Sequence, residues 1–332
     1  MKIAVVIPSY NVRHHVLGVI SRIGTEVALI YVVDDCCPQL SGQYVQDNCS
    51  DKRVKILFHS LNRGVGGAMC TGYAAALQDG AEIIVKIDGD GQMDPGILQR
   101  FTAPIQDGLA DYTKGNRFFN LDTLWRMPWV RLVGNSGLSL INKVTTGYWN
   151  CIDPTNGYTA IHRGVLSMIP LEKIDPRYFF ESDILFRLST LRAVVLDIPM
   201  DAFYGDEKSS LNIKKVLVEF PPKFFVRIFK RIVYQYIFRE FNIGTLCFFL
   251  GLPCFVFGVL FGAYSWWESG LGHVLASSGT VMLAALPIFI GFQLLLMAVF
   301  FDVSNYPKIP LVRLFRYVHL GNSAPSKDLA EP

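Results

Sequence analysis

The sequence lacks the patterns by which proteins commonly bind zinc or build a disulfide framework. Its 332 residues contain six His and seven Cys, but no CxxC pair, no HExxH motif and no cluster that mixes the two residue types. The number of Cys is odd, and two of them, Cys36 and Cys37, are adjacent. These absences argue against a zinc site and predict reduced thiols that face a cytoplasm.

Two common phosphate-binding loops are absent as well. The stretch NRGVGGAM at residues 62–69 is rich in glycine, but Met69 stands where a GxGxxG motif needs its third glycine. No GK[ST] follows, so the stretch is not a P-loop either. Both a dinucleotide-binding protein and a P-loop NTPase are therefore disfavoured. The turn still precedes a helical pattern, and such a turn can face a phosphate group.

Charge is missing from two long stretches near the carboxyl end. Residues 241–267 and 274–301 contain no Asp, Glu, Lys or Arg. Each stretch exceeds the roughly 20 residues that cross a bilayer core, which predicts two transmembrane helices. Basic residues lie outside the pair, whereas the connecting loop carries only Glu268 and His273. The positive-inside rule then predicts a multi-pass protein of the cytoplasmic (inner) membrane with both termini in the cytoplasm.

The rest of the chain has a different charge balance on either side of residue 210. Residues 1–210 hold 20 basic and 22 acidic residues, whereas residues 211–332 hold 11 basic and 6 acidic residues. The basic residues lie mostly beside apolar segments, which argues against a nucleic-acid-binding protein. Residues 211–240 mix Lys and Arg with Phe, Ile and Tyr, as amphipathic segments at a membrane interface do. The amino terminus opens on a strand-like run without a cleavage site, so no signal peptide is expected.

Residues 1–210 alternate between strand-like and helix-like patterns. This alternation predicts an α/β domain with a mainly parallel sheet and helices on both faces. The strands are expected at 3–8, 29–35, 54–59 and 82–88, and the helices between them at 12–23 and 66–80.

Carboxylates stand at the ends of two of these strands. Asp34 and Asp35 end the second strand, and Asp88 ends the fourth, with Asp90 and Gln92 close behind. Ligands of such sheets bind outside the carboxyl ends of the strands, so the two acidic groups are expected to share one cleft. They offer oxygen ligands only, which suits Mg²⁺ or Mn²⁺ bound together with a substrate's phosphates.

These segments resemble family-two glycosyltransferases of the GT-A (Rossmann-like) fold. VVIPSYN, VVDD, LNRGVGGAMCTGY, KIDGDGQMDP and KGNRF follow in the order and spacing of that family over residues 1–210. With two membrane spans behind them, the chain looks most like the polyprenyl-phosphate, or dolichol-phosphate mannose synthase-like, hexosyltransferases. The resemblance implies a domain of residues 1–210, juxtamembrane helices at 211–240, a membrane hairpin at 241–302 and a cytoplasmic tail at 303–332.

The resemblance also implies roles for single residues. The donor nucleotide sugar would be bound by Pro8, Tyr10, Asn11, Asp34, Asp35, Asn62, Gly64, Gly67, Asp88 and Gly89. Asp90 and Gln92, with Asp88, would hold the divalent metal. Arg117 of GNR would contact a phosphate or the acceptor, and Lys208 would replace an Arg that relatives carry before a G-x-S-K-like segment, where this chain has Phe203 and Tyr204.

Candidate bases are Asp153, Glu181 and Asp183. Each has a structural alternative, because Asp153 precedes Pro154 and so suits a turn, and the other two suit a helix start. Arg117 likewise suits an ordinary ion pair. A sugar hydroxyl acceptor would need one of these bases, whereas a lipid phosphate is already anionic.

The function implied is inverting, metal-dependent transfer of a hexose from a UDP-, GDP- or dTDP-linked donor. The acceptor would be an undecaprenyl or dolichyl phosphate at the cytoplasmic membrane face. Two alternatives stay open: transfer to a hydroxyl of a polyprenyl-diphosphate-linked sugar in O-antigen, capsule or other cell-envelope polysaccharide assembly, and a non-catalytic subunit that binds nucleotide sugars. The hairpins of several copies would also allow a homo-oligomer.

Overall fold

The computed structural model describes residues 1–119, 129–201, 213–239, 241–272 and 275–315. The chain divides into two compact units. The sheet unit comprises Met1–Phe224 and Pro307–Pro332, and the hairpin unit comprises Phe225–Tyr306.

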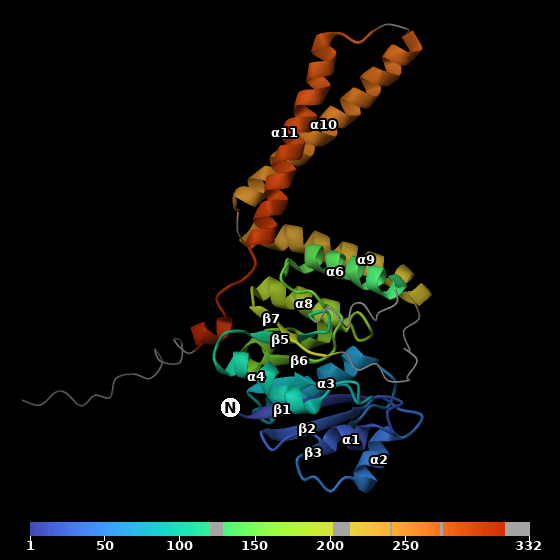
Figure 1. The fold of residues 1–332 in the computed structure, drawn as a ribbon, viewed down its shortest axis with the longest axis vertical. Helices are drawn as coiled ribbons and strands as arrows, with labels where there is room; N and C mark the ends of the chain where they lie inside the picture. Colours follow the sequence, from blue (N-terminus) through green and yellow to red (C-terminus); the bar gives the residue numbers. More distant parts are fainter. Residues whose placement is uncertain (120–128, 202–212, 240, 273–274, 316–332) are drawn as a thin grey trace, which may run out of the picture. The chain divides into compact units, whose positions relative to one another are not determined.

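The sheet unit contains a seven-stranded sheet in the order β3-β2-β1-β4-β6-β5-β7 (Figure 1). Strand β6 runs antiparallel to both of its neighbours, and the other pairs are parallel. The expected mainly parallel α/β sheet is thus confirmed. The strands are β1 (Ile3–Ser9), β2 (Val27–Asp34), β3 (Val54–Phe58), β4 (Ile83–Lys86), β5 (Tyr112–Asn116), β6 (Thr159–His162) and β7 (Val195–Pro199).

Helices connect the strands of the sheet unit and form the hairpin unit. The expected helix at 12–23 is shorter in the structure, because Val12 to His15 form a turn closed by the His15 N–H donating to the Val12 carbonyl. The helices are α1 (Val16–Ser21), α2 (Ser41–Asn48), α3 (Val65–Gln78), α4 (Leu98–Gln106), α6 (Trp129–Thr146), α7 (Arg163–Leu166), α8 (Phe180–Leu191), α9 (Ile213–Arg231), α10 (Ile243–Gly272) and α11 (Ser278–Ser304). Two 3₁₀ turns, Pro95–Ile97 and Leu171–Lys173, and a π-helix over Ile232–Arg239 complete them.

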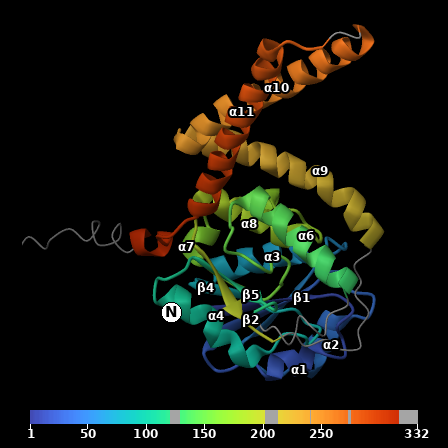
Figure 2. The same cartoon turned by 45° about the horizontal axis from the view of Figure 1, so that its top comes forward.

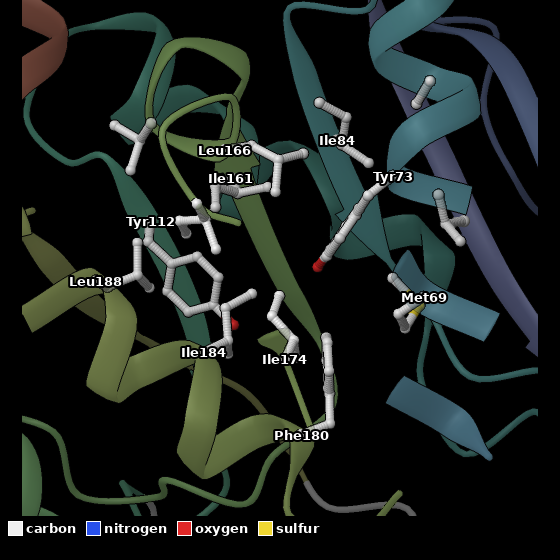
Figure 3. Packing of buried hydrophobic residues seen from close by; sticks show 14 of the residues in the cluster. Met69, Tyr73, Ile84, Tyr112, Ile161, Leu166, Ile174, Phe180, Ile184 and Leu188 are labelled. Atoms are coloured by element: carbon white, nitrogen blue, oxygen red, sulfur yellow. The ribbon is translucent and has the colours of Figure 1, made fainter. Parts of the chain in front are cut away.

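The sheet is buried on both faces, as its β-branched strands require. In β1, Ala4 and Val6 face one core, and Ile3, Val5 and Ile7 face the other, because successive side chains of a strand point to opposite faces. Helices α3 and α8 cover the first face, and α1 and α4 cover the second. The side chains of α3 and α8 meet over the sheet (Figure 3), so the start of α8 has a fixed position.

A segment that follows the hairpin in sequence belongs to the sheet unit. The amides of Leu311 and Val312 donate to the two carboxylate oxygens of Asp111 at 2.9 Å each. The amide of Val194 donates to the same carboxylate at 2.8 Å, and Val312 is buried. The short stretch 310–312 of the expected tail is therefore packed against the sheet unit.

Helix α9 joins the two units and has two different faces. Phe220 and Phe224 pack with Phe179 in edge-to-face geometry, and α6 lies beside α9 (Figures 1 and 2), contributing Leu138 and Ile141 to the same cluster. Large apolar side chains such as Val218, Phe225 and Phe229 lie exposed on the same helix. Such a division is typical of a helix at a membrane interface.

The hairpin unit consists mainly of α10 and α11. Both helices are long and apolar enough to cross a membrane, and they agree with the spans expected from the two uncharged stretches. The helices approach closely at Gly251 and Gly291, where a Cβ atom on Gly291 would lie 2.5 Å from the Phe255 nitrogen. At one end of the unit, Arg231 and Tyr236 both bond the carboxylate of Asp302.

Candidate functional site

The loops that follow β1, β2 and β4 lie at one edge of the sheet. These three strands are neighbours and run parallel, and Ser9 pairs with Asp34 in register. The turn after β4 packs closely on the loop after β1, since a Cβ atom on Gly89 would lie 3.0 Å from the Val12 side chain. The carboxyl edge of the sheet thus gathers the expected donor-binding residues.

Pro8 lies near the end of β1, and Tyr10 and Asn11 open the loop that follows the strand. Tyr10 is 46% exposed, as a side chain that stacks on a ligand needs to be. Asn11 has a φ of 58°, a left-handed conformation that Asn tolerates better than most residues. Its amide donates to the sulfur of Cys37 at 3.1 Å, which fixes the loop against the segment after β2.

Asp34 shapes the connection between β2 and α2. Its carboxylate is buried and accepts the amides of Cys37 and Gly42 at 2.8 and 2.6 Å. A Cβ atom on Gly42 would lie 2.7 Å from the Asp34 side chain, so only glycine fits there. The carboxylate therefore holds the loop together beside the site.

Asp35 organises the glycine-rich turn. One oxygen accepts the Arg63 amide and the other accepts the Gly64 amide, each at 2.7 Å, and Asn62 donates to the Asp35 carbonyl at 3.2 Å. The ring of His59 contacts the same carboxylate at 2.8 Å. Sequence reasoning overlooked His59, because a single histidine at the end of a strand belongs to no recognisable motif. Asp35 and His59 together present the turn to the edge of the sheet.

The glycine-rich turn needs its glycines for a close approach by another segment. Gly64 has a φ of +87° and leads into α3, which starts at Val65. The Gly67 amide donates to the carbonyl of Pro176 at 2.9 Å. A Cβ atom on Gly66 would lie 2.2 Å from the Asp175 carbonyl oxygen. The turn is thus locked to the chain just before α8.

Lys86 lies at the centre of the site. Sequence reasoning missed it, because a lysine is ordinarily a surface residue and nothing in the local pattern indicates that this one is buried and paired. It is 1% exposed, and its ammonium lies 2.7 Å from an Asp88 oxygen and 3.4 Å from a Glu181 oxygen. Burial by itself lowers the pKa of Lys86, but the two carboxylates outweigh burial and raise the pKa above its ordinary value. Lys86 therefore remains charged and joins β4 to the start of α8.

Gly157 completes this group from the neighbouring loop. A Cβ atom there would lie 2.5 Å from the Lys86 nitrogen and 2.6 Å from an Asp88 oxygen. Lys114, on β5, is a second buried lysine and donates to the carbonyl of Asn156. Burial lowers the pKa of Lys114, whereas nearby acidic groups oppose the effect.

Asp90 and Gln92 form the turn after Asp88. Asp90 accepts the amide of Gln92 at 3.0 Å, and Gly91 has a φ of +78°. Among the described residues, no set of three His, Cys, Asp or Glu side chains is placed to hold a metal. Asp88 and Asp90 nevertheless supply the oxygen donors that fit Mg²⁺ or Mn²⁺, since such ions complete their coordination with substrate phosphates and water.

Arg117 and Asp153 form an ion pair. Two guanidinium nitrogens of Arg117 donate to the two oxygens of the fully buried Asp153 at 2.8 and 3.0 Å, and the Arg117 amide donates as well. This forked pair fixes the plane of the guanidinium, and 26% of the Arg117 side chain is exposed. Gly157 follows Asp153 by four residues, so one loop holds both Arg117 and the Asp88 group.

The acidic start of α8 divides into two roles. Asp183 is fully buried, accepts the Asp175 amide at 2.9 Å and pairs with Arg187. Glu181 is 15% exposed and faces Lys86. The expected Lys208, with Phe203 and Tyr204, lies outside the described residues.

Comparisons with known proteins bear on the family of the chain. The model of "Glycosyl transferase family 2" matches residues 4–169. The chain is 31% identical to the UDP-N-acetylglucosamine–dolichyl-phosphate N-acetylglucosaminyltransferase of Methanococcus voltae, over 53% of this chain and 68% of that protein. It is 28% identical to the undecaprenyl-phosphate mannosyltransferase of Micrococcus luteus, over 64% of this chain and 89% of that protein.

The fold is also similar to solved structures. Glucosyl-3-phosphoglycerate synthase from Mycobacterium tuberculosis, in complex with Mn²⁺, UDP and phosphoglyceric acid, superposes with a TM-score of 0.52 at 16% identity. The superposition covers 69% of this chain and 78% of that one. The expected GT-A fold is confirmed.

Proposed function

Because the chain belongs to glycosyl transferase family 2, we propose that it is an inverting, metal-dependent hexosyltransferase with a polyprenyl phosphate as acceptor. The donor is a nucleoside diphosphate sugar. The observation that carries the proposal is the single loop, residues 153–157, that holds Arg117 through Asp153 and abuts Asp88 through Gly157. This loop thereby brings the fixed guanidinium to the same edge of the sheet as the carboxylates of Asp88 and Asp90. These two residues, with Gly89 between them, form the DGD turn.

The donor's nucleotide would lie over the loops after β1 and β2, and its diphosphate would face the DGD turn. A divalent cation held by Asp88, Asp90 and Gln92 would neutralise charge on the leaving diphosphate. Lys86 holds the Asp88 carboxylate in place from the buried side. The glycine-rich turn would act indirectly, because its Arg63 and Gly64 amides hold the carboxylate of Asp35 beside the nucleotide.

The engaged carboxylates favour a phosphate acceptor over a sugar hydroxyl. Both oxygens of Asp153 contact Arg117, and Asp183 is held by Arg187 and the Asp175 amide. Glu181 accepts a hydrogen bond from the Lys86 ammonium at 3.4 Å, so it too is engaged. A lipid phosphate needs no base, because it is already anionic. Its oxygen would attack the anomeric carbon opposite the leaving diphosphate, and Arg117 would orient it.

The experiment described below also tests two alternative functions. Transfer to a hydroxyl of a lipid-diphosphate-linked sugar would use Glu181 as base, because it is the partly exposed acid of α8. A non-catalytic nucleotide-sugar-binding subunit would bind donor without turnover. The family membership favours an enzyme, and the relatives' names favour lipid phosphates.

Membrane attachment would keep the site at the surface where the lipid acceptor resides. The spans α10 and α11 and the exposed apolar face of α9 support this placement. We propose that the sheet unit and both termini lie in the cytoplasm, in accordance with the basic residues that flank the spans. The expectation that the cations of 211–240 face lipid applies to Lys230, which is exposed, whereas Arg231 is buried against Asp302.

The test is transfer of labelled sugar from UDP-, GDP- and dTDP-sugars to a polyprenyl phosphate by the purified full-length chain. Asp90→Asn is expected to remove nearly all turnover while UDP still binds, since the loop can keep its shape. Asp94→Asn is the matched control, because Asp94 caps the next 3₁₀ turn by accepting the Gly96 amide, a role that Asn also fills.

Four results would contradict parts of the proposal. Turnover that persists undiminished in EDTA would exclude the metal, and a product of retained configuration would exclude inversion. Transfer only to a lipid-diphosphate-linked sugar, with loss in Glu181→Gln, would establish the hydroxyl acceptor instead. Donor binding with no transfer to either lipid would support the non-catalytic alternative.

A further inference from the structure

We propose that Lys223 of α9 is a positioning residue for the donor site, which it reaches through the turn Asp175–Arg177. The proposal rests on the proposed function, because it takes Asp35, whose carboxylate accepts the amides of the glycine-rich turn, to bind the donor's nucleotide. Lys223 lies on α9, within the segment 211–240 that was expected to lie at the membrane interface.

The first link joins α9 to the turn before α8. The Lys223 ammonium lies 2.5 Å from an Asp175 carboxylate oxygen, and the Asp175 side chain is only 10% exposed. The ammonium also lies 5.5 Å from the ring centre of Phe179, which packs against Phe220 and Phe224. The Lys223 side chain is 31% exposed, so the pair is only partly buried, but the buried Asp175 and the aromatic packing hold it more firmly than a surface pair.

The second link fixes the turn itself. The other Asp175 carboxylate oxygen accepts the Arg177 amide at 3.0 Å, and the Asp175 amide donates to Asp183 at 2.9 Å. Asp183 is in turn paired with Arg187 on the same helix. The turn therefore has one set orientation relative to α8, and Asp175 is bonded from α9 and α8 at once.

The third link reaches the glycine-rich turn. The Pro176 carbonyl accepts the Gly67 amide at 2.9 Å, and hypothetical Cβ atoms on Gly64 and Gly66 would lie 2.6 Å from the Pro176 oxygen and 2.2 Å from the Asp175 oxygen. The two turns line one surface groove of about 930 Å³. Contacts this close leave no room for one turn to shift without the other.

These contacts give Lys223 a function that its distance along the chain conceals. Loss of its charge would release Asp175, and the turn would no longer hold Gly64 and Gly67 at the position where the Asp35 carboxylate binds the Gly64 amide. The donor would then bind more weakly, although Lys223 belongs to a helix that was assigned to the membrane interface.

The experiment measures UDP binding by calorimetry and the donor KM in full-length protein. Lys223→Met is expected to raise the Kd for UDP and the donor KM together, on the order of fivefold, with a smaller change in kcat. Lys223→Arg should restore most of the affinity, because the guanidinium can still pair with Asp175. Lys230→Met is the matched control, since Lys230 is an exposed cation on the same helix, and it should bind UDP as the parent does.

Asp175→Asn provides an independent variant, because the amide oxygen can still accept the Arg177 amide while the charge is lost. Its effect and that of Lys223→Met should not add in the double variant, since both remove the same pair. If Lys223→Met binds UDP as tightly as the parent, or if Lys230→Met weakens binding equally, the positioning role is refuted. If the parent itself binds no nucleoside diphosphate, the proposed function fails instead.

Discussion

Lys86→Met should reveal how strongly the site depends on one buried charge. The ammonium of Lys86 compensates Asp88 and Glu181, whose side chains are 31% and 15% exposed. Removal of one partner from a buried ion pair costs about 3–5 kcal/mol. Because water reaches both carboxylates in part, we expect about 2–3 kcal/mol of destabilisation. At roughly 2–4 °C per kcal/mol, as for a domain of about 150–250 residues, the melting temperature would fall by roughly 4–12 °C.

The matched control is Lys114→Met. Lys114 is as buried as Lys86, but burial lowers its pKa. The Lys114 ammonium donates to a backbone carbonyl, whereas the Lys86 ammonium faces two carboxylates. Methionine keeps most of the stem packing and removes the cost of burying a charge, so the stability should change by about 1 kcal/mol or less. The two variants differ mainly in what their ammonium groups face.

The assay is thermal unfolding of the full-length protein in detergent at pH 7, with and without MnCl₂. Since the pKa of Lys86 is raised, its ion pairs are complete at pH 7 and are lost only as the pH rises through that raised pKa. A divalent cation would replace part of the missing charge, so MnCl₂ should stabilise Lys86→Met more than the parent. If Lys86→Met unfolds no earlier than Lys114→Met, the compensating role of Lys86 is wrong.

Three further outcomes follow from single positions. Gly157→Ala should lower turnover roughly tenfold or more, because its Cβ atom would displace the Lys86–Asp88 pair. Gly18→Ala should leave turnover unchanged, because open space surrounds Gly18, and equal activities of the two variants in a transfer assay would contradict this prediction. Asp111→Ala should destabilise the chain by about 2–3 kcal/mol and expose the segment after residue 310 to protease, because three amides lose their acceptor; an unchanged digestion pattern would refute it. A reporter fused after Pro332 should read cytoplasmic, and a signal from the opposite side would overturn the topology.

The sequence sufficed for features that depend on local pattern. The β-branched runs at 3–8 and 29–35 form β1 and β2, because strand formation there follows from side-chain type and alternation. The two uncharged stretches form α10 and α11, since length and hydropathy alone decide such helices. The carboxylates that end β2 and follow β4 lie at one edge, because parallel strands place their carboxyl ends together.

Strands β5 and β6 were not predicted from the sequence, because their local strand preference is weak. Tyr112–Asn116 contains a lysine, a glycine and an asparagine, which disfavour strands, and it forms β5 because two neighbouring strands supply its hydrogen bonds. Strand β6 is only four residues long and pairs antiparallel with β4. Partners far along the chain override weak local preference.

The same limit applies to the site. The sequence identified Asp88, Asp153 and Glu181 by type and position, but it did not indicate that Arg117 occupies both oxygens of Asp153. Lys86 lies 95 residues from Glu181 along the chain, and only the tertiary fold brings them within 3.4 Å. Local pattern determines which residues form an element and where it ends. Charge pairing in the interior depends on which distant segments meet, and packing of the whole chain decides that.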